Sequence, residues 1–175
     1  MTKRIAAISG SLRKSSTNTD ILNNLGSYVG ADAEFLIYEG LDKLPYFSPE
    51  LDTDQAADSV LHFREFLRSA DAVVICTPEY AFGVPGVLKN ALDWLVSSAE
   101  LYQKPVATIS ASPTPMGGDK AHESLRLTLS ALDAKFIENG KLIIPFIRLK
   151  IDSQRKVIDS DLEKSLRDLI LLLTN

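Results

Sequence analysis

Short apolar runs alternate with longer segments of helical spacing along the whole chain. Five continuous runs have the form of strands that are covered by helices on both faces. They are RIAAIS (4–9), AEFLIY (33–38), AVVIC (72–76), PVATIS (105–110) and KLIIPF (141–146). Between these runs, apolar residues recur every three or four positions, as on the buried face of an amphipathic helix. The pattern therefore predicts five strands that alternate with helices.

Each predicted helix is identified by a set of periodic apolar positions. The sets are Ile21, Leu22, Leu25 and Val29; Val60, Phe63 and Leu67; Leu88, Leu92 and Leu95; Leu125, Leu129 and Leu132; and Leu162, Leu166, Leu169 and Leu173. Right-handed crossovers between parallel strands place helices on both faces of the sheet, which predicts a doubly wound α/β sandwich of three layers. No composition shift or repeat divides residues 1–175, so we expect one domain. The polar connection at 38–54 is long enough to move or to cover part of the surface.

Composition limits the possible partners and the compartment. The 175 residues are 45% hydrophobic and 24% charged, which is typical of a globular domain with a sizeable core. A net charge of -4 argues against a nucleic-acid partner. Neither a signal peptide nor an apolar run of the ~18 residues that a membrane span needs is recognisable. Cys76 has no partner for an internal disulfide and lies in an apolar run, so we expect a buried, inert thiol and a cytoplasmic protein.

The first strand leads into a loop that is rich in hydrogen-bond donors. In a doubly wound sheet, ligands bind at the carboxyl ends of the strands, so the loops after Ile8, Cys76 and Ile109 are the candidate sites. The first of them, ISGSLRKSSTN (8–18), precedes a helix and supplies hydroxyl groups together with Arg13. This combination predicts an anion site, although the serines could instead serve only as helix caps. The loop does not match the pattern G-x-x-x-x-G-K-[ST], and it lacks the second and third glycines of G-x-G-x-x-G, which favours a single phosphate monoester.

The second and third loops suggest a site for a planar ring. The second, TPEYAFGVPGVLKNALDWLV (77–96), is stiffened by two prolines. Its aromatic residues Tyr80, Phe82 and Trp94 either press on a planar ring or pack in the core. The third, SASPTPMGGDKAHESLRLTL (110–129), carries Gly117 and Gly118, which allow a close backbone approach or simply form a flexible turn. The helix start behind them is expected to offer positive potential.

The two histidines do not suggest a metal site or a general base. His62 and His122 lie in predicted helices, without acidic or cysteine residues at the spacing of metal ligands. We therefore expect neither residue to bind a metal or to transfer a proton, and no metal is predicted.

The motifs GSLRKSSTN and PEYAFGVPGVLKNALDW resemble those of the NADPH-dependent FMN reductase family, which includes quinone, chromate and azo-dye reductases. With the strand pattern, the resemblance covers essentially the whole chain. It implies a flavodoxin-like fold with sheet order 2-1-3-4-5, bound FMN, and a homodimer that sometimes pairs into a homotetramer. We expect the helix around VLKNALDWL near the dimer interface, with Trp94 at its edge.

Carried over position by position, the resemblance also names residues that bind the cofactor. They are Ser11, Arg13, Ser16, Thr17 and Asn18 in the phosphate loop; Pro78, Glu79, Tyr80 and the main chain of Ala81 beside the isoalloxazine ring; and Ser110, Gly117 and Gly118 in the third loop. The chain departs from the family pattern at three positions. Ala81 replaces a common asparagine, Lys120 an arginine and His122 a glutamine.

The implied function is an oxidoreductase in which the flavin itself carries the chemistry, so no catalytic side chain is named. Hydride passes from NADPH or NADH to FMN, and electrons then pass to a small electron-poor acceptor such as a quinone, a flavin, an azo compound or a metal oxyanion. Two other interpretations remain open at this point. One is a non-catalytic electron carrier of the flavodoxin type, and the other is a phosphate-sensing module without redox chemistry. The acceptor and the choice between NADPH and NADH stay open.

Overall fold

The computed structural model describes residues 2–175, and it contains a five-stranded parallel sheet of order β2-β1-β3-β4-β5. The strands are β1 (Lys3–Ser9), β2 (Ala33–Ile37), β3 (Ala72–Thr77), β4 (Pro105–Ala111) and β5 (Lys135–Ile144). Every neighbouring pair is parallel. The predicted flavodoxin-like fold and strand order are therefore confirmed.

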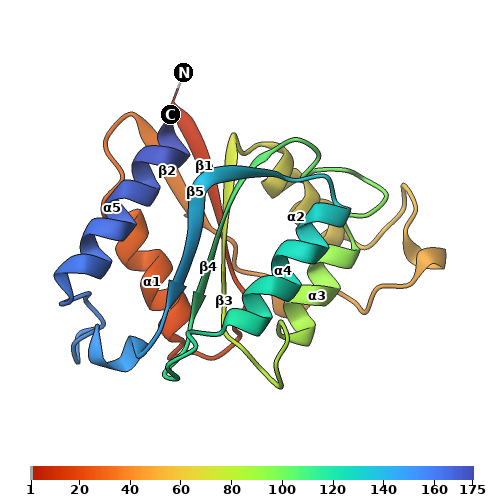
Figure 1. Ribbon diagram of the computed structural model, residues 1–175. Coiled ribbons are helices and arrows are strands. Elements are labelled where there is room, and N and C mark those ends of the chain that lie inside the picture. Colours follow the sequence, from red (N-terminus) through yellow and green to blue (C-terminus); the bar gives the residue numbers. More distant parts are fainter. Residues whose placement is uncertain (1) are drawn as a thin grey trace.

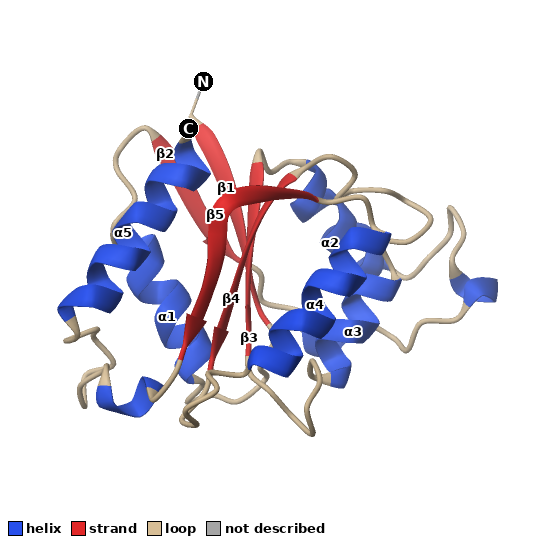
Figure 2. Cartoon of the chain, viewed as in Figure 1, coloured by secondary structure: helices blue, strands red, loops and turns tan. Residues whose placement is uncertain are grey.

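Helices cover both faces of the sheet (Figures 1 and 2). On one face lie α1 (Thr17–Gly26) and α5 (Ser160–Thr174), and on the other lie α2 (Asp58–Arg68), α3 (Gly86–Asp93) and α4 (Asp119–Ala131). Alternate residues of the strands point to the two sides. Ile5 and Val74 pack with α1 and α5, whereas Ile8 packs with the other three helices. No helix among residues 2–175 has the length and the apolar character that crossing a membrane would require.

Strand β5 begins six residues earlier than the apolar run predicted. Its first half reads KFIENG, and its side chains are largely exposed or half-buried because β5 is an edge strand. The register with β4 shifts between Val106 and Thr108, where the strand bulges. Asn139 adopts a left-handed φ of 61° within the bulge. A bulged, charged edge strand lacks the continuous apolar run by which a buried strand is recognised.

The polar connection at 38–57 is fastened to α3. It contains two short 3-10 helices, η1 (Leu41–Lys43) and η2 (Pro49–Leu51), and it extends outward beside α3 in Figure 1. The side chain of Asn90 accepts the Phe47 N–H at 2.8 Å and donates to the Pro45 carbonyl at 3.0 Å. The connection is therefore held against the helix by paired hydrogen bonds.

Trp94 is buried in the protein core rather than exposed at its surface. Its side chain is completely buried, its indole N–H donates to the Pro45 carbonyl at 2.9 Å, and its ring meets Phe47 edge-on. The expectation that Trp94 borders a pairing surface is wrong, because the connection at 38–57 already covers it.

Candidate functional site

The carboxyl ends of all five strands meet at one edge of the sheet, the lower edge in Figure 1. The loop from Gly10 to Ser16 leaves β1 there and enters α1. Ser16 occupies the N-cap position, yet its side chain makes no capping hydrogen bond. Within residues 2–175, the first N–H of this helix with a protein acceptor is that of Asp20, which donates to the Ser16 carbonyl at 3.0 Å. The preceding N–H groups remain available to an anion, so the interpretation of the serines as mere caps is not supported.

The side chains of this loop divide into exposed and buried groups. Arg13 is exposed, and its backbone N–H donates to the Ser11 hydroxyl at 3.4 Å. Asn18 is buried, and its side-chain oxygen accepts the Cys76 thiol at 3.2 Å. Burial raises the pKa of Cys76, so the thiol stays protonated and donates. The prediction that Cys76 is buried is confirmed, and its thiol bonds to Asn18, a predicted site residue.

The loop after β3 is a tight turn with an aromatic surface. Tyr80 and Gly83 exchange two backbone hydrogen bonds of 3.0 Å, and this pairing places Ala81 and Phe82 at φ of 49° and 62°. The Tyr80 side chain is 47% exposed and that of Phe82 is 80% exposed. These two aromatic residues are thus free at the surface, unlike Trp94. A cavity of about 380 Å³ joins this loop to Gly10 and Arg13 of the first loop.

The loop after β4 requires glycine at two consecutive positions. Gly117 and Gly118 have φ of 64° and 81°. A Cβ at Gly117 would lie 2.6 Å from the Ile143 side chain, so no other residue fits there without rearrangement. A Cβ at Gly118 would lie 3.5 Å from the Cβ atoms of Glu79 and Ser110. The backbone conformation of this turn therefore favours glycine at both positions, and Gly118 lies beside predicted site residues of two loops.

Backbone N–H groups in the first turn of α4 already donate to side-chain carboxylates of the protein. Glu79 accepts the Ala121 N–H at 3.0 Å, and Asp119 accepts the Lys120 N–H at 2.9 Å. Two acidic groups thus balance the positive end of the helix. The expectation that this helix start offers free positive potential to a ligand is wrong for these N–H groups.

His122 joins α4 to β4 through a buried chain of hydrogen bonds. Its Nε2 lies 2.8 Å from the Thr108 hydroxyl, and its Nδ1 lies 3.0 Å from that of Ser110. Burial lowers the pKa of His122 to about 4, helped by the nearby cations Lys141 and Arg126. The imidazole is neutral at pH 7, and its two nitrogens are engaged inside the protein. Ser110 is fully buried as well, so its hydroxyl is committed to this chain.

Arg126 extends this set of hydrogen bonds, because its Nη1 lies 3.4 Å from the Thr108 oxygen. A guanidinium can only donate, so the Thr108 oxygen accepts this bond.

A group of basic residues lies beside the loop from Gly10 to Ser16. Arg13, Ser15 and Thr17 line a cavity of about 440 Å³ together with Arg148 and Arg155. The last two come from the connection between β5 and α5, which lies beside the start of α1 in Figure 1. Sequence reasoning did not single out these two arginines, because no local motif surrounds them and only the fold brings them to the loop.

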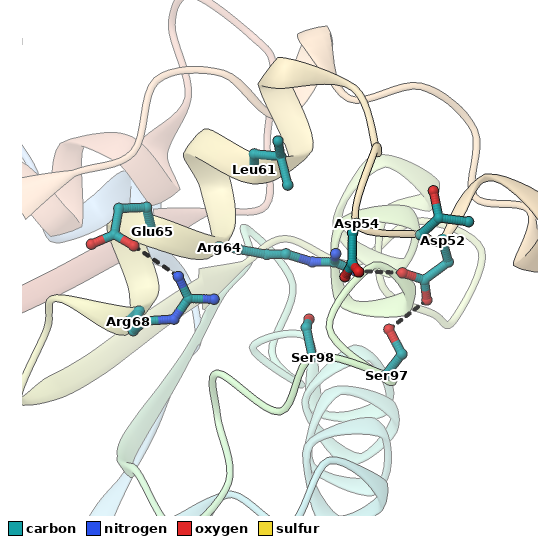
Figure 3. A pocket seen from close by; sticks show the side chains of 9 residues that line it. Asp52, Asp54, Leu61, Arg64, Glu65, Arg68, Ser97 and Ser98 are labelled. Carbon is teal, nitrogen blue, oxygen red and sulfur yellow. Dashed lines mark hydrogen bonds and ion pairs between the residues drawn. The ribbon is translucent and has the colours of Figure 1, made fainter.

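The largest of the described cavities, about 620 Å³, lies away from this edge, between α2 and the turn after α3. Figure 3 shows its main polar contacts. Asp52 accepts hydrogen bonds from Arg64 and from Ser97, both at 2.6 Å, while Arg68 pairs with Glu65 at 2.8 Å. The bond to Arg64 ties the 38–57 connection to α2, and the bond to Ser97 ties it to the turn after α3. Within residues 2–175, no three His, Cys, Asp or Glu side chains are grouped so that they could hold a metal ion.

Comparisons with known proteins agree with this geometry. Residues 3–148 match the family described as NADPH-dependent FMN reductase. The chain is 30% identical over 175 residues to the probable NADPH:quinone oxidoreductase 2 of Oryza sativa, and the alignment covers 97% of this chain and 86% of that protein. It is 32% identical over 160 residues to the quinone reductase of Escherichia coli K12, with coverage of 89% and 85%.

A solved structure with a similar fold is that of FerB, a flavoenzyme NAD(P)H:(acceptor) oxidoreductase from Paracoccus denitrificans. The TM-score is 0.87 at 27% identity, and the alignment covers 98% of this chain and 95% of FerB. The chain belongs to the NADPH-dependent FMN reductase family, and it is an oxidoreductase of the flavodoxin-like class.

Proposed function

We propose that the protein binds FMN at the carboxyl edge of its sheet and passes electrons from NAD(P)H through it to a small electron-poor acceptor. The observation that carries this proposal is the convergence of three loops. A Cβ placed on Gly118 would lie 3.5 Å from the Cβ atoms of Glu79 and Ser110, so the second and third loops approach closely. The cavity lined by Gly10, Arg13 and Tyr80 joins the second loop to the first. Bound FMN supplies the hydride and electron transfer chemistry.

The phosphate end of FMN fits the first loop. The N–H groups at the start of α1, with the hydroxyls of Ser11 and Ser16, form a set of donors that suits a phosphate monoester. The exposed guanidinium of Arg13 adds a planar fork of donors. Thr17 lies at the first helical position, and Asn18 secures the loop to β3 through Cys76.

The ring end fits between the second and third loops. Pro78, Glu79, Tyr80 and the left-handed turn at Ala81 and Phe82 form one wall, and Gly117 with Gly118 forms the other. Because the Glu79 carboxylate is bonded to Ala121, this residue serves the ring through its main chain and through the coupling of the two loops. The missing asparagine side chain at Ala81 removes one polar contact without changing the backbone shape.

The surface around the ring site is apolar and open. Tyr80, Phe82 and Met116 are exposed at the same edge, with Met116 at 59%. Planar reactants can therefore stack beside the flavin, and we expect the nicotinamide and the acceptor to occupy this surface in turn, with ping-pong kinetics. The reductase interpretation is favoured over a flavodoxin-type carrier because the related proteins are reductases and because a net charge of -4 is only mildly acidic.

We further propose a homodimer that forms through the α3 side of the molecule, with pairing into a tetramer left open. Exposed apolar side chains of Tyr46, Phe82 and Val96 flank α3 and support this choice, although Trp94 does not contribute. A stable interface of this kind buries more than about 1,200 Å². Light scattering of the FMN-loaded protein at micromolar concentration tests it, since a monomer would contradict the proposal. A cytoplasmic location stays a prediction.

Titration of FMN with the purified protein tests the proposed function. Quenching of the flavin fluorescence, followed by oxidation of NADPH or NADH that accelerates when a benzoquinone is added, is the expected result. Tight FMN binding without nicotinamide oxidation would instead favour the carrier. No quenching at all would contradict the proposed site.

A further inference from the structure

The imidazole of His122 on α4 bridges two residues of β4. Its Nε2 lies 2.8 Å from the Thr108 hydroxyl, and its Nδ1 lies 3.0 Å from the Ser110 hydroxyl. Alternate residues of a strand point to the same face of the sheet, so one side chain can contact both. All three residues are completely buried. The imidazole is therefore out of reach of a ligand, and any effect that it has on the proposed site must pass through a neighbouring residue.

Ser110 is the neighbour that leads to the ring site. It is the second-last residue of β4, at the carboxyl edge of the sheet. A Cβ placed on Gly118 would lie 3.5 Å from the Cβ of Ser110, so the serine side chain lies directly against the glycine turn of the third loop. Thr108 lies two residues deeper in the strand, where Arg126 also contacts it. One nitrogen of His122 thus supports the third loop, and the other contacts the body of the protein.

The backbone of His122 holds the same glycine from the opposite direction. Its N–H donates to the Gly118 carbonyl at 3.0 Å. The Gly118 N–H, in contrast, donates to no backbone carbonyl among residues 2–175. His122 therefore fixes Gly118 twice, through its own main chain and through its side chain by way of Ser110. Both contacts leave the Gly118 N–H available to a ligand.

We propose that His122 is a positioning residue for the flavin ring, and that its bond to Ser110 holds the turn at Gly117 and Gly118 in one place beside the ring. This inference rests on the proposed function, in which the two glycines form one wall of the ring site. Movement of Ser110 away from the imidazole would leave a buried nitrogen without a partner, which is costly. Ser110, and the turn that lies against it, therefore have one strongly favoured position.

Two matched substitutions separate positioning from stability. Ser110→Ala and Thr108→Val each remove one partner of His122 and leave a buried nitrogen unpaired, so we expect similar falls in melting temperature. Only Ser110→Ala should also weaken the binding of FMN and of riboflavin. The loss should be about threefold to tenfold, within the range for one neutral hydrogen bond. It should be equal for the two flavins, because they share the ring and the phosphate loop is unchanged.

Substitutions of His122 itself test whether the two residues act through one bond. His122→Leu should weaken both flavins as Ser110→Ala does, and the double variant should bind them no more weakly than either single variant. His122→Gln retains a donor and an acceptor and should recover part of the affinity. His62→Leu, at an exposed histidine of α2, is the control and should have no effect.

Amide hydrogen exchange of the FMN-free protein measures the position of the turn without the cofactor. The N–H groups of Gly117 and Asp119 donate to carbonyls within the turn, both at 3.2 Å. Their exchange should be faster in Ser110→Ala than in Thr108→Val. Equal flavin affinities in these two variants, or equal exchange, would overturn the inference. If the original protein binds no FMN, the proposed function fails, but the exchange rates still decide whether His122 positions the turn.

Discussion

The carboxylate of Glu79 accepts the backbone N–H of Ala121 at 3.0 Å and so ties the loop after β3 to the first turn of α4. These two segments flank the proposed ring site, and this bond holds them at a fixed separation. Glu79, a residue predicted to bind the cofactor, thus uses its side chain to connect the loop after β3 to α4.

Glu79→Ala should therefore weaken both the fold and the binding of FMN. The loss resembles that of a helix cap, about 0.5–2 kcal/mol in the free energy of unfolding. Glu79→Gln keeps an acceptor oxygen and should lose less than the alanine variant. Thermal unfolding of the FMN-free protein measures the first effect, and flavin fluorescence measures the second. Glu123→Ala, on the exposed side of the same helix, is the control. Equal behaviour of Glu79→Ala and this control would refute the coupling of the loops.

Arg13 is expected to bind the phosphate of FMN and no other part of it. Arg13→Ala should lower the affinity for FMN by about tenfold to a hundredfold, because charge-assisted hydrogen bonds are lost. Riboflavin has the same ring and ribityl chain without the phosphate, so its weaker binding should hardly change. Equal losses for both flavins, or a lower melting temperature without ligand, would show that Arg13 supports the fold instead.

His122 should make the stability of the protein depend on acidic pH. Its pKa in the folded protein is about 4, below the ordinary value near 6.5, so the unfolded chain takes up the proton first as the pH falls. The contribution of the neutral imidazole to the free energy of unfolding is complete above about pH 6.5. It is lost as the pH falls toward 4, which lowers the free energy of unfolding by about 2–3 kcal/mol. Urea unfolding at several pH values should show a smaller decline for His122→Gln than for the original protein. Identical declines would contradict burial of a neutral imidazole.

Much of the fold could be predicted because buried parallel strands are recognisable in the sequence as short continuous apolar runs. The runs at 4–9, 72–76 and 105–110 lie within or near β1, β3 and β4, where both faces are covered by helices. The first half of β5 could not be found in this way, since an exposed edge tolerates residues such as Glu138. The predicted loops were correct in position for the same reason: parallel strands bring their carboxyl ends to one edge.

The details of the site depend on contacts between distant residues, which local pattern does not contain. The acceptor for the Ala121 N–H comes from a residue 42 positions earlier. Similarly, the indole N–H of Trp94 donates to the carbonyl of Pro45. Arg155 forms an ion pair with Asp20, which lies 135 positions earlier in the sequence. The sequence placed His122 in a helix, but its role as a buried link between α4 and β4 depends on the positions of Thr108 and Ser110.

Ala81 stores strain that a substitution should release. Its φ of 49° lies in the left-handed region, which costs roughly 1–2 kcal/mol for a residue with a side chain. Ala81→Gly should therefore stabilise the folded protein by up to about 1 kcal/mol, after the entropy of the freer unfolded chain is counted. Ala91→Gly, in the middle of α3, should destabilise it by a similar amount. A loss of stability in both variants, measured by thermal unfolding, would show that the turn is not strained.

Anaerobic mixing of the FMN-loaded protein with NADPH or NADH is the decisive experiment for electron transfer through the flavin, because it separates the first transfer from the choice of acceptor. The visible absorption of the bound flavin should bleach rapidly, and it should return when a benzoquinone is added without oxygen. A protein that holds FMN but keeps its full absorption with both nicotinamide nucleotides would contradict the proposed reductase function.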